Sequence, residues 1–204
     1  MGKRKARIAV LVSGGGTNLQ AIFDAQKSGI IKSGKVVLVI SNKPDAYALT
    51  RAKNEKTPSL VITRKECGGQ KAFEEKISAA ISEYKIDLIV LAGFMAILSA
   101  DFTSRYPRRM INVHPSLIPS FCGKGFYGLH VHEAALAKGV KVTGATVHFV
   151  NEIPDGGEII MQKAVRVHDG DTPEKLQKRV MKQAEWKILP AAVEKISEEI
   201  TGGK

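Results

Sequence analysis

The first 114 residues alternate apolar runs with segments in which apolar residues recur every three or four positions. The apolar runs have no polar face, which is typical of strands buried on both sides in a parallel sheet. The intervening segments have the period of amphipathic helices, which cover such a sheet. The pattern predicts strands at residues 7–13, 35–41, 59–63, 87–92 and 110–114, and helices at residues 17–27, 46–55 and 69–84.

The second half of the chain has a different pattern. Residues 141–150 and 158–167 alternate and are rich in β-branched side chains, and a Pro-Asp-Gly-Gly turn at residues 154–157 separates them. This arrangement predicts an antiparallel hairpin. Thr172 and the proline after it are a start signal for a final helix to about residue 200, and Pro190 is expected to kink or split that helix.

Together these patterns predict an α/β fold. The expected architecture is a mostly parallel, doubly wound, Rossmann-like sheet with an antiparallel hairpin in the C-terminal half and a long C-terminal helix. A length of 204 residues suits one well-packed domain over residues 1–204.

Composition excludes several classes of partner. The formal net charge is +11, but the lysines are scattered and no basic block is interleaved with aromatic residues, so nucleic acid is not expected as a partner. No apolar stretch is long enough to span a membrane, and residues 8–12 are too short for a signal sequence. Cys67 and Cys122 have no metal spacing and are expected to be free thiols, which favours a cytoplasmic location.

A glycine-rich loop, SGGGTNL at residues 13–19, joins the first predicted strand to the first predicted helix. Glycines let the backbone approach an anion, and the free N–H groups of a helix N-terminus can bind it. A nucleotide triphosphatase loop would need Gly-Lys-Ser/Thr, which is absent. A dinucleotide fingerprint would need Gly or Ala at Leu19 and an acidic residue near Asn42. A monophosphate site is therefore favoured over a turn without a ligand.

Asn112 and His114 lie two residues apart at the end of the fifth predicted strand, so their side chains are expected on the same face. An Asn amide can stabilise a developing oxyanion, and a His can exchange a proton near neutral pH. Asp155, on the hairpin turn, would raise the pKa of the imidazole if it faced His114. Alternatively, Asp155 is only a residue that favours the turn conformation and has no catalytic role. No Ser or Cys has a nucleophile context, so direct transfer between two bound substrates fits better than a covalent intermediate.

The other histidines give weaker signals. His130 and His132 could form half of a metal site, but no third ligand follows at a usual spacing, and no metal is expected. His148 lies on a segment rich in β-branched residues and is interpreted as a half-buried packing residue or a partner that supports the site.

Several motifs in one order resemble the glycinamide ribonucleotide (GAR) formyltransferases of purine synthesis. They are SGGGTNLQ at residues 13–20, LAGFMAILS at 91–99, NVHPSLIPSF at 112–121, GATVHFVNEIPDGG at 144–157, and Glu185. The match covers nearly the whole chain, and the combination is highly specific. The resemblance implies an enzyme that transfers a formyl group from 10-formyltetrahydrofolate, as co-substrate, to the amine of GAR.

The resemblance also implies roles for individual residues. The catalytic positions of the family match Asn112, His114 and Asp155, and its GAR-binding positions match Gly16, Thr17, Asn18 and Glu185. Its folate-binding positions match Gln70, Met95, Ala96, Ile97, Leu98, Asn112, Asn151, Glu152, Ile153, Pro154 and Asp155. The chain would then have a phosphate- and ribotide-binding half over about residues 1–107 and a catalytic and folate-binding half over about residues 108–204.

Two features depart from the family pattern. Bacterial relatives often carry Arg where Ala96 stands and near Gln70, so the tail of the folate is expected to be held differently. The glycine-rich segment 122–129 is longer than in some relatives. It is expected to be a mobile surface loop, and its proximity to the Asn-x-His motif makes it a candidate lid.

Related activities leave alternatives. A methionyl-tRNA formyltransferase would need a C-terminal tRNA-binding domain, and a formyltetrahydrofolate hydrolase would carry an N-terminal regulatory domain; neither is expected in this chain. A non-catalytic phosphoribosyl-ligand binding protein is an alternative of a different class. The sequence is compatible with a monomer and with a homodimer.

Overall fold

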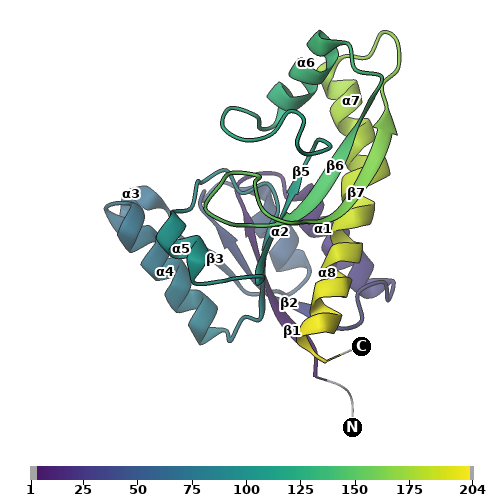
Figure 1. Ribbon diagram of the computed structural model, residues 1–204. Coiled ribbons are helices and arrows are strands. Elements are labelled where there is room, and N and C mark those ends of the chain that lie inside the picture. Colours follow the sequence, from purple (N-terminus) through teal and green to yellow (C-terminus); the bar gives the residue numbers. More distant parts are fainter. Residues whose placement is uncertain (1–3, 203–204) are drawn as a thin grey trace.

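A computed structural model describes residues 4–202. Within these residues, seven strands form one sheet in the order β3-β2-β1-β4-β5-β6-β7 (Figure 1). The strands are β1 (Ala6–Val12), β2 (Gly34–Ser41), β3 (Ser59–Val61), β4 (Leu88–Leu91), β5 (Met110–His114), β6 (Val142–Phe149) and β7 (Ile159–Arg166).

Strand directions divide the sheet into two parts. Strands β3, β2, β1, β4 and β5 are parallel, whereas β5, β6 and β7 pair antiparallel. This confirms the predicted mostly parallel sheet with a C-terminal hairpin. From β1 the chain passes outward to β2 and β3, and then returns to place β4 on the other side of β1. The carboxyl ends of β1 and β4 therefore flank a switch point, the place where open α/β sheets bind ligands.

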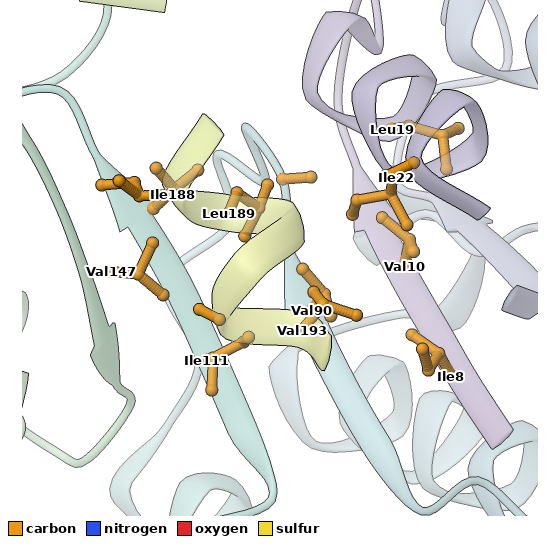
Figure 2. Close-up of a cluster of buried hydrophobic side chains, with 14 of the residues drawn as sticks. Ile8, Val10, Leu19, Ile22, Val90, Ile111, Val147, Ile188, Leu189 and Val193 are labelled. Carbon is orange, nitrogen blue, oxygen red and sulfur yellow. The ribbon is translucent and has the colours of Figure 1, made fainter. Parts of the chain in front are cut away.

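Helices cover both faces of the sheet. They are α1 (Thr17–Lys27), α2 (Tyr47–Asn54), α3 (Arg64–Cys67), α4 (Gln70–Glu83), α5 (Ala100–Ser104), α6 (Leu129–Lys138), α7 (Pro173–Val180) and α8 (Trp186–Ile200), with a π-helical turn, η1 (Met181–Glu185), between the last two. Because side chains of a strand alternate in direction, Val10 faces α1 and α8 whereas Leu11 faces α4 and α5. Figure 2 shows the first of these cores, where Ile22 and Val193 approach the strands.

Three helices, α3, α5 and α6, were not predicted from the sequence. Helices α3 and α5 span one or two turns, too short for an apolar period to be recognised, and each starts at a side-chain cap, Thr63 or Ser99. Helix α6 buries Val131, His132 and Ala135, so its buried face includes a polar residue that weakens the apolar pattern. By contrast, the predicted bounds of α1 and β5 agree with the structure.

The C-terminal helix starts as predicted but does not split at Pro190. The Thr172 hydroxyl accepts a hydrogen bond from the Lys175 N–H at 3.3 Å and caps α7. Helix α8 continues through Pro190, and the irregular hydrogen bonding lies over η1 instead. Pro190 removes the donor for the carbonyl of Trp186, four residues earlier. That carbonyl lies at the junction with η1, where the helical hydrogen bonding already changes, so the loss is absorbed there.

The core beneath α4 gives a stability test. Ile77 is fully buried against the sheet, so Ile77→Ala removes buried carbon atoms and leaves a cavity. We expect the free energy of unfolding to fall by about 2–5 kcal/mol, measured by urea denaturation. Lys76→Ala, one residue away on the exposed side of the helix, is the matched control. Equal effects of the two substitutions would contradict the assigned packing.

Candidate active site

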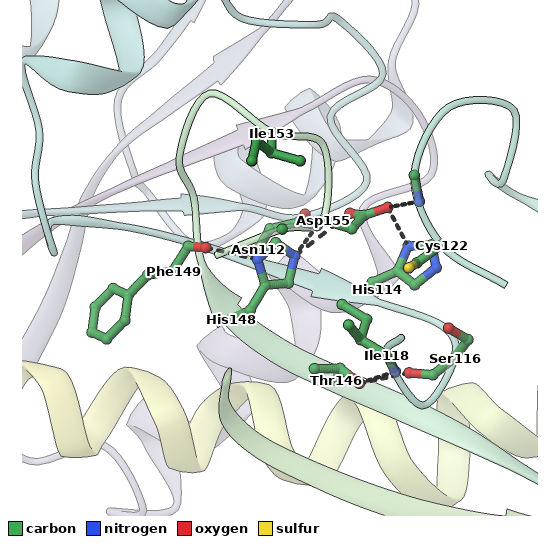
Figure 3. Close-up of polar contacts among 12 residues, drawn as sticks. Asn112, His114, Ser116, Ile118, Cys122, Thr146, His148, Phe149, Ile153 and Asp155 are labelled. Atoms are coloured by element: carbon green, nitrogen blue, oxygen red, sulfur yellow. Dashed lines mark hydrogen bonds and ion pairs between the residues drawn. The ribbon is translucent and has the colours of Figure 1, made fainter. Parts of the chain in front are cut away.

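The candidate site residues come from several loops at or near the carboxyl edge of the sheet. The glycine loop follows β1, residues 92–99 follow β4, and Asn112 and His114 end β5. The loop between β6 and β7 folds back toward β5 and carries Asp155 to these side chains (Figure 3). The structure therefore brings the three predicted catalytic residues together.

His114 is buried, with 4% of its surface exposed. Its Nε2 lies 2.8 Å from the Phe121 carbonyl oxygen, and its Nδ1 lies 3.4 Å from Oδ2 of Asp155. A carbonyl only accepts, so Nε2 carries the hydrogen of the neutral ring. Burial lowers the pKa of His114 and outweighs Asp155 and the Phe121 carbonyl, which raise it. Asp155 thus acts in the predicted direction, but burial sets the net shift, and the ring is mainly neutral at neutral pH.

Asp155 is held in a left-handed backbone conformation with a φ of 56°, which is uncommon for a residue with a Cβ. Its Oδ2 accepts a hydrogen bond from the Gly123 N–H at 2.9 Å, and its Oδ1 lies 3.5 Å from His148 Nε2. Burial raises the pKa of this carboxyl, but His148, His114 and the Gly123 N–H together bring the pKa below its usual value. Asp155 is therefore ionised at neutral pH.

Asn112 is oriented by the neighbouring strand. The antiparallel register sets it opposite His148, and its Nδ2 lies 3.1 Å from His148 Nε2. His148 Nδ1 lies 2.7 Å from the Phe149 carbonyl oxygen, so Nδ1 carries the hydrogen of the neutral ring, and in that ring Nε2 accepts from Asn112. The Asn112 nitrogen has one longer contact, 3.5 Å to Oδ1 of Asp155. One of its two N–H groups is thus held only weakly and can donate to another acceptor instead.

His148 has the second of its two predicted roles, that of a partner that supports the site. It is 2% exposed rather than half-buried, and it touches both Asn112 and Asp155. The strand register places it there, because the pairing of β6 with β5 sets His148 across from Asn112. The register itself could not be read from the sequence.

The turn after β5 is braced from β6 and β7. The Thr146 hydroxyl donates to the Ser116 carbonyl at 2.7 Å and accepts from the Ile118 N–H at 3.1 Å (Figure 3). The Gln162 amide on β7 donates to the same hydroxyl at 3.0 Å. These bonds fix the backbone that leads from His114 to Phe121, whose carbonyl in turn orients His114.

The glycine loop leads into the N-terminus of α1, where Gly16 is in a left-handed conformation. At the start of the helix, Asn18 Nδ2 donates to Oε2 of Glu185 at 2.7 Å. Glu185 is 6% exposed, and burial raises its pKa, which the Asn18 hydrogen bond only partly offsets. The predicted ribotide residues Asn18 and Glu185 are therefore in direct contact, although 167 positions separate them.

Glu185 reaches this position from an irregular helix. It is the last residue of η1, and the regular α8 starts directly after it. Single π-helical turns inside α-helices shift the following side chains around the axis and are frequent at functional sites. The irregular turn thus lies at the residue that meets Asn18, which the sequence did not predict.

The segment that follows β4 alternates in exposure. Met95 and Ile97 are exposed, at 49% and 72%, whereas Ala96 and Leu98 pack against the core beneath α4. Of the four predicted folate residues here, two therefore present side chains to solvent, and two pack their side chains against the core. The Met95 N–H donates to the buried Ser13 hydroxyl at 2.7 Å, which ties this segment to the start of the glycine loop.

Gln70 and Glu74 hold the same segment from α4. The Gln70 amide donates to the Ile97 carbonyl at 3.1 Å and to the Glu74 carboxylate. Glu74 is buried and accepts from both the backbone N–H and the hydroxyl of Ser99, each at 2.6 Å. The predicted folate residue Gln70 is thus engaged with the backbone of the segment. Glu74 and Ser99 were not predicted, because an isolated Glu and Ser carry no sequence signal.

The β6–β7 loop exposes its remaining predicted residues. Glu152, Ile153 and Pro154 are exposed, and the Asn151 side chain accepts from the Ile153 N–H at 3.0 Å, which shapes the loop. In Figure 3, Ile153 lies on the loop beside Asp155. Ile153 therefore adds an exposed apolar side chain close to the polar cluster.

His130 and His132 separate on α6. His130 is exposed and pairs with Glu133 at 3.0 Å, whereas His132 is fully buried, and burial lowers its pKa to about 4. Among residues 4–202 no three His, Cys, Asp or Glu side chains are grouped to hold a metal ion. In the same range no helix combines the length and the apolar character needed to cross a membrane.

Comparisons with known proteins agree with this architecture. A profile of the formyl transferase family matches residues 6–193. The trifunctional purine biosynthetic protein adenosine-3 of Homo sapiens is 45% identical over 195 residues, which are 96% of this chain and 19% of that protein. This chain therefore spans about a fifth of the length of the trifunctional relatives it matches.

Separate enzymes match along most of their length. The phosphoribosylglycinamide formyltransferase of Haemophilus influenzae is 42% identical over 192 residues, which cover 94% of this chain and 87% of that protein. The crystal structure of glycinamide ribonucleotide transformylase 1 from Symbiobacterium toebii has a TM-score of 0.89 and 40% sequence identity, and the match covers 96% of this chain and 89% of that one.

The contact between Asp155 and His114 can be tested by titration. Asp155 raises the pKa of His114, so Asp155→Asn should lower that pKa further. We expect the ring signals of His114 to titrate at a lower pH in the variant, measured by NMR. Asp169→Asn, which changes an exposed carboxylate, serves as the control. An unchanged or raised His114 pKa would contradict the assigned contact.

Burial of Glu185 should make stability depend on pH. Its pKa is raised in the folded state, so its contribution to stability is present below the pKa of the unfolded chain, near 4.3, and is lost as the pH rises through the folded pKa. As the pH rises from about 5 to about 8, we expect the free energy of unfolding to fall less for Glu185→Gln than for the wild type. Denaturation at each pH measures this. Glu198→Gln, exposed on α8, should follow the wild type; parallel curves for Glu185→Gln would refute the effect.

Proposed function

The chain belongs to the formyl transferase family, and we propose that it is a phosphoribosylglycinamide formyltransferase of purine biosynthesis. The enzyme transfers the formyl group of 10-formyltetrahydrofolate to the amine of GAR, and the products are formyl-GAR and tetrahydrofolate. One observation carries the proposal: Asn112 and Asp155 gather around the buried His114 in one polar cluster, near a glycine loop with the Asn18–Glu185 pair. The named relatives of comparable length support it.

GAR binds at the glycine loop in this proposal. The free N–H groups at the start of α1 donate hydrogen bonds to the phosphate of the ribotide, which the positive end of the helix also attracts. Gly16, Thr17 and Asn18 form this end of the site. Glu185 hydrogen-bonds the ribose hydroxyls, and the Asn18 amide fixes the orientation of its carboxylate. The GAR amine is thereby directed toward His114.

The folate lies along the exposed apolar side chains near the polar cluster. Met95, Ile97 and Ile153 present apolar surface that a flat pteridine ring can cover. Ala96 and Leu98 offer backbone groups, and residues 151–155 flank the ring. Gln70 acts on the folate through the backbone of residues 95–98, because its amide is already engaged with the Ile97 carbonyl.

The transfer needs an oxyanion site and a proton carrier. The amine nitrogen attacks the formyl carbon and forms a C–N bond, and the formyl oxygen becomes an oxyanion. The weakly held N–H of Asn112 exchanges its long contact with Asp155 for this oxyanion, a contribution of about 3–4 kcal/mol for a well-placed donor. The bond from the formyl carbon to N10 of the folate then breaks. The amine loses one proton, and N10 gains one.

His114 and Asp155 move this proton. Burial keeps His114 mainly neutral at neutral pH, and its Nε2–H is bound to the Phe121 carbonyl. Nδ1, the nitrogen that faces Asp155, is therefore the basic atom that takes a proton and returns it. The ionised Asp155 stabilises the imidazolium while the proton is held. His148 keeps the Asn112 amide aligned throughout.

The direct test is a mass-spectrometric assay for formyl-GAR with GAR and 10-formyltetrahydrofolate as substrates. We expect product from the wild type and none above background from His114→Ala. Asp155→Asn should fold and lose about a hundredfold or more in rate, whereas Asp169→Asn should be unaffected. Formate without formyl-GAR would replace the proposal by a hydrolase. Binding of GAR without either product would favour a phosphoribosyl-ligand binding protein, and near-normal turnover of Asp155→Asn would remove Asp155 from the mechanism.

A further inference from the structure

The glycine loop is held from one side by helix α2. The Gly14 carbonyl accepts a hydrogen bond from the Ala48 N–H at 3.0 Å, and the Gly15 carbonyl accepts from Arg51 Nε at 2.8 Å. Gly16 packs so closely on α2 that an added Cβ would lie 2.6 Å from the Cβ of Ala48. Helix α2 thus fixes three consecutive glycines, and only the middle one, Gly15, accepts a hydrogen bond from a side chain.

Arg51 is itself fixed in place by two further contacts. Its Nη1 donates to Oε1 of Gln20 on α1 at 3.1 Å, and its guanidinium carbon lies 5.1 Å from the centre of the Tyr47 ring. A free arginine side chain has high rotamer entropy, so contacts on two sides are needed to keep its Nε directed at one carbonyl. The guanidinium therefore links α1, α2 and the glycine loop.

This anchoring determines where the loop directs its N–H groups. In a planar trans peptide, the carbonyl of one residue and the N–H of the next point in opposite directions. With the carbonyls of Gly14 and Gly15 bound toward α2, the N–H groups of Gly15 and Gly16 point away from α2. No group of residues 4–202 accepts a hydrogen bond from either of them. A Cβ added at Gly14 or Gly15 would meet no atom within 4 Å, so this part of the loop is open.

We infer that Arg51 is a positioning residue for the phosphate of the acceptor substrate. It holds the Gly15 carbonyl, and thereby turns the Gly16 N–H toward the anion that the start of α1 also attracts. The inference rests on the proposed function for the identity of the acceptor. Its physical content, a phosphate-ester site whose backbone donors depend on Arg51, can be tested without catalysis.

The test compares Arg51→Gln, Arg51→Lys and the matched control Lys53→Gln, which removes one exposed charge from the same helix. The steady-state constants are measured with GAR and with its 5′-hydroxyl analogue, which lacks the phosphate. We expect Arg51→Gln to raise KM for GAR about tenfold, with kcat and the KM of the folate unchanged. The rise should disappear with the 5′-hydroxyl analogue. Arg51→Lys should show a smaller rise, because lysine keeps the charge but lacks the fork that reaches both acceptors.

Three results would overturn the inference. The first is an equal KM for GAR in Arg51→Gln and Lys53→Gln. The second is an equal rise in KM for GAR and for its 5′-hydroxyl analogue. The third is a wild-type KM in Arg51→Lys, which would show that only the charge of residue 51 matters. If Arg51→Gln does not fold, Gln20→Ala removes one of the two anchors. It should then raise KM for GAR by a smaller factor, again only for the phosphorylated acceptor, and an unchanged KM would reject the inference.

A binding experiment separates this inference from the proposed function. Ribose 5-phosphate is titrated into the wild type and the variants, and binding is followed by calorimetry. Weaker binding to Arg51→Gln than to Lys53→Gln supports the role of Arg51 even if the wild type forms no formyl-GAR. Equal binding to the two variants refutes that role even if formyl transfer is observed.

Discussion

Antiparallel pairing of β5 with β6 is the constraint on which the candidate site depends. The pairing sets His148 opposite Asn112 and Thr146 opposite His114, and it leads the chain into the loop that carries Asp155. A slip of one residue would turn every side chain of β6 to the other face of the sheet. The parallel strands β1 and β4 add the glycine loop and residues 92–99 at the neighbouring switch point. The site is thus assembled by strand direction and register.

Several features of the site are unfavourable for folding and are tolerated because the surroundings fix them. Asp155 and Phe121, the two partners of His114, both have a positive φ, at 56° and 49°. Glu185 is buried with one neutral amide as its partner. Strained backbone and buried ionisable groups persist where the rest of the structure holds them in place, and they are common at functional sites. Here Ala184 and Ile188, the neighbours of Glu185 on η1 and α8, belong to the core against the sheet, and the Gly123 N–H holds the Asp155 carboxylate.

The sequence predicted the features that depend on local patterns. The bounds of α1 and β5, the Thr172 cap and the hairpin follow from apolar period, capping residues and turn residues. Features that depend on tertiary contacts could not be predicted. The burial of His148 needs the strand register, and the lowered pKa of His114 needs the balance between burial and Asp155. The use of the Gln70 amide on a backbone carbonyl likewise has no sequence signal.

In the proposed function, one acceptor amine lies between the glycine loop and the cluster of Asn112, His114 and Asp155. A crystal structure with GAR and a folate analogue whose formyl group is attached through carbon, and so cannot leave, tests it most directly. We expect the phosphate on the N–H groups of Gly16 to Asn18 and the amine nitrogen within about 3.5 Å of the formyl carbon. The formyl oxygen should lie within hydrogen-bond distance of Asn112 Nδ2. A phosphate bound elsewhere, or an amine directed away from His114, would contradict the account.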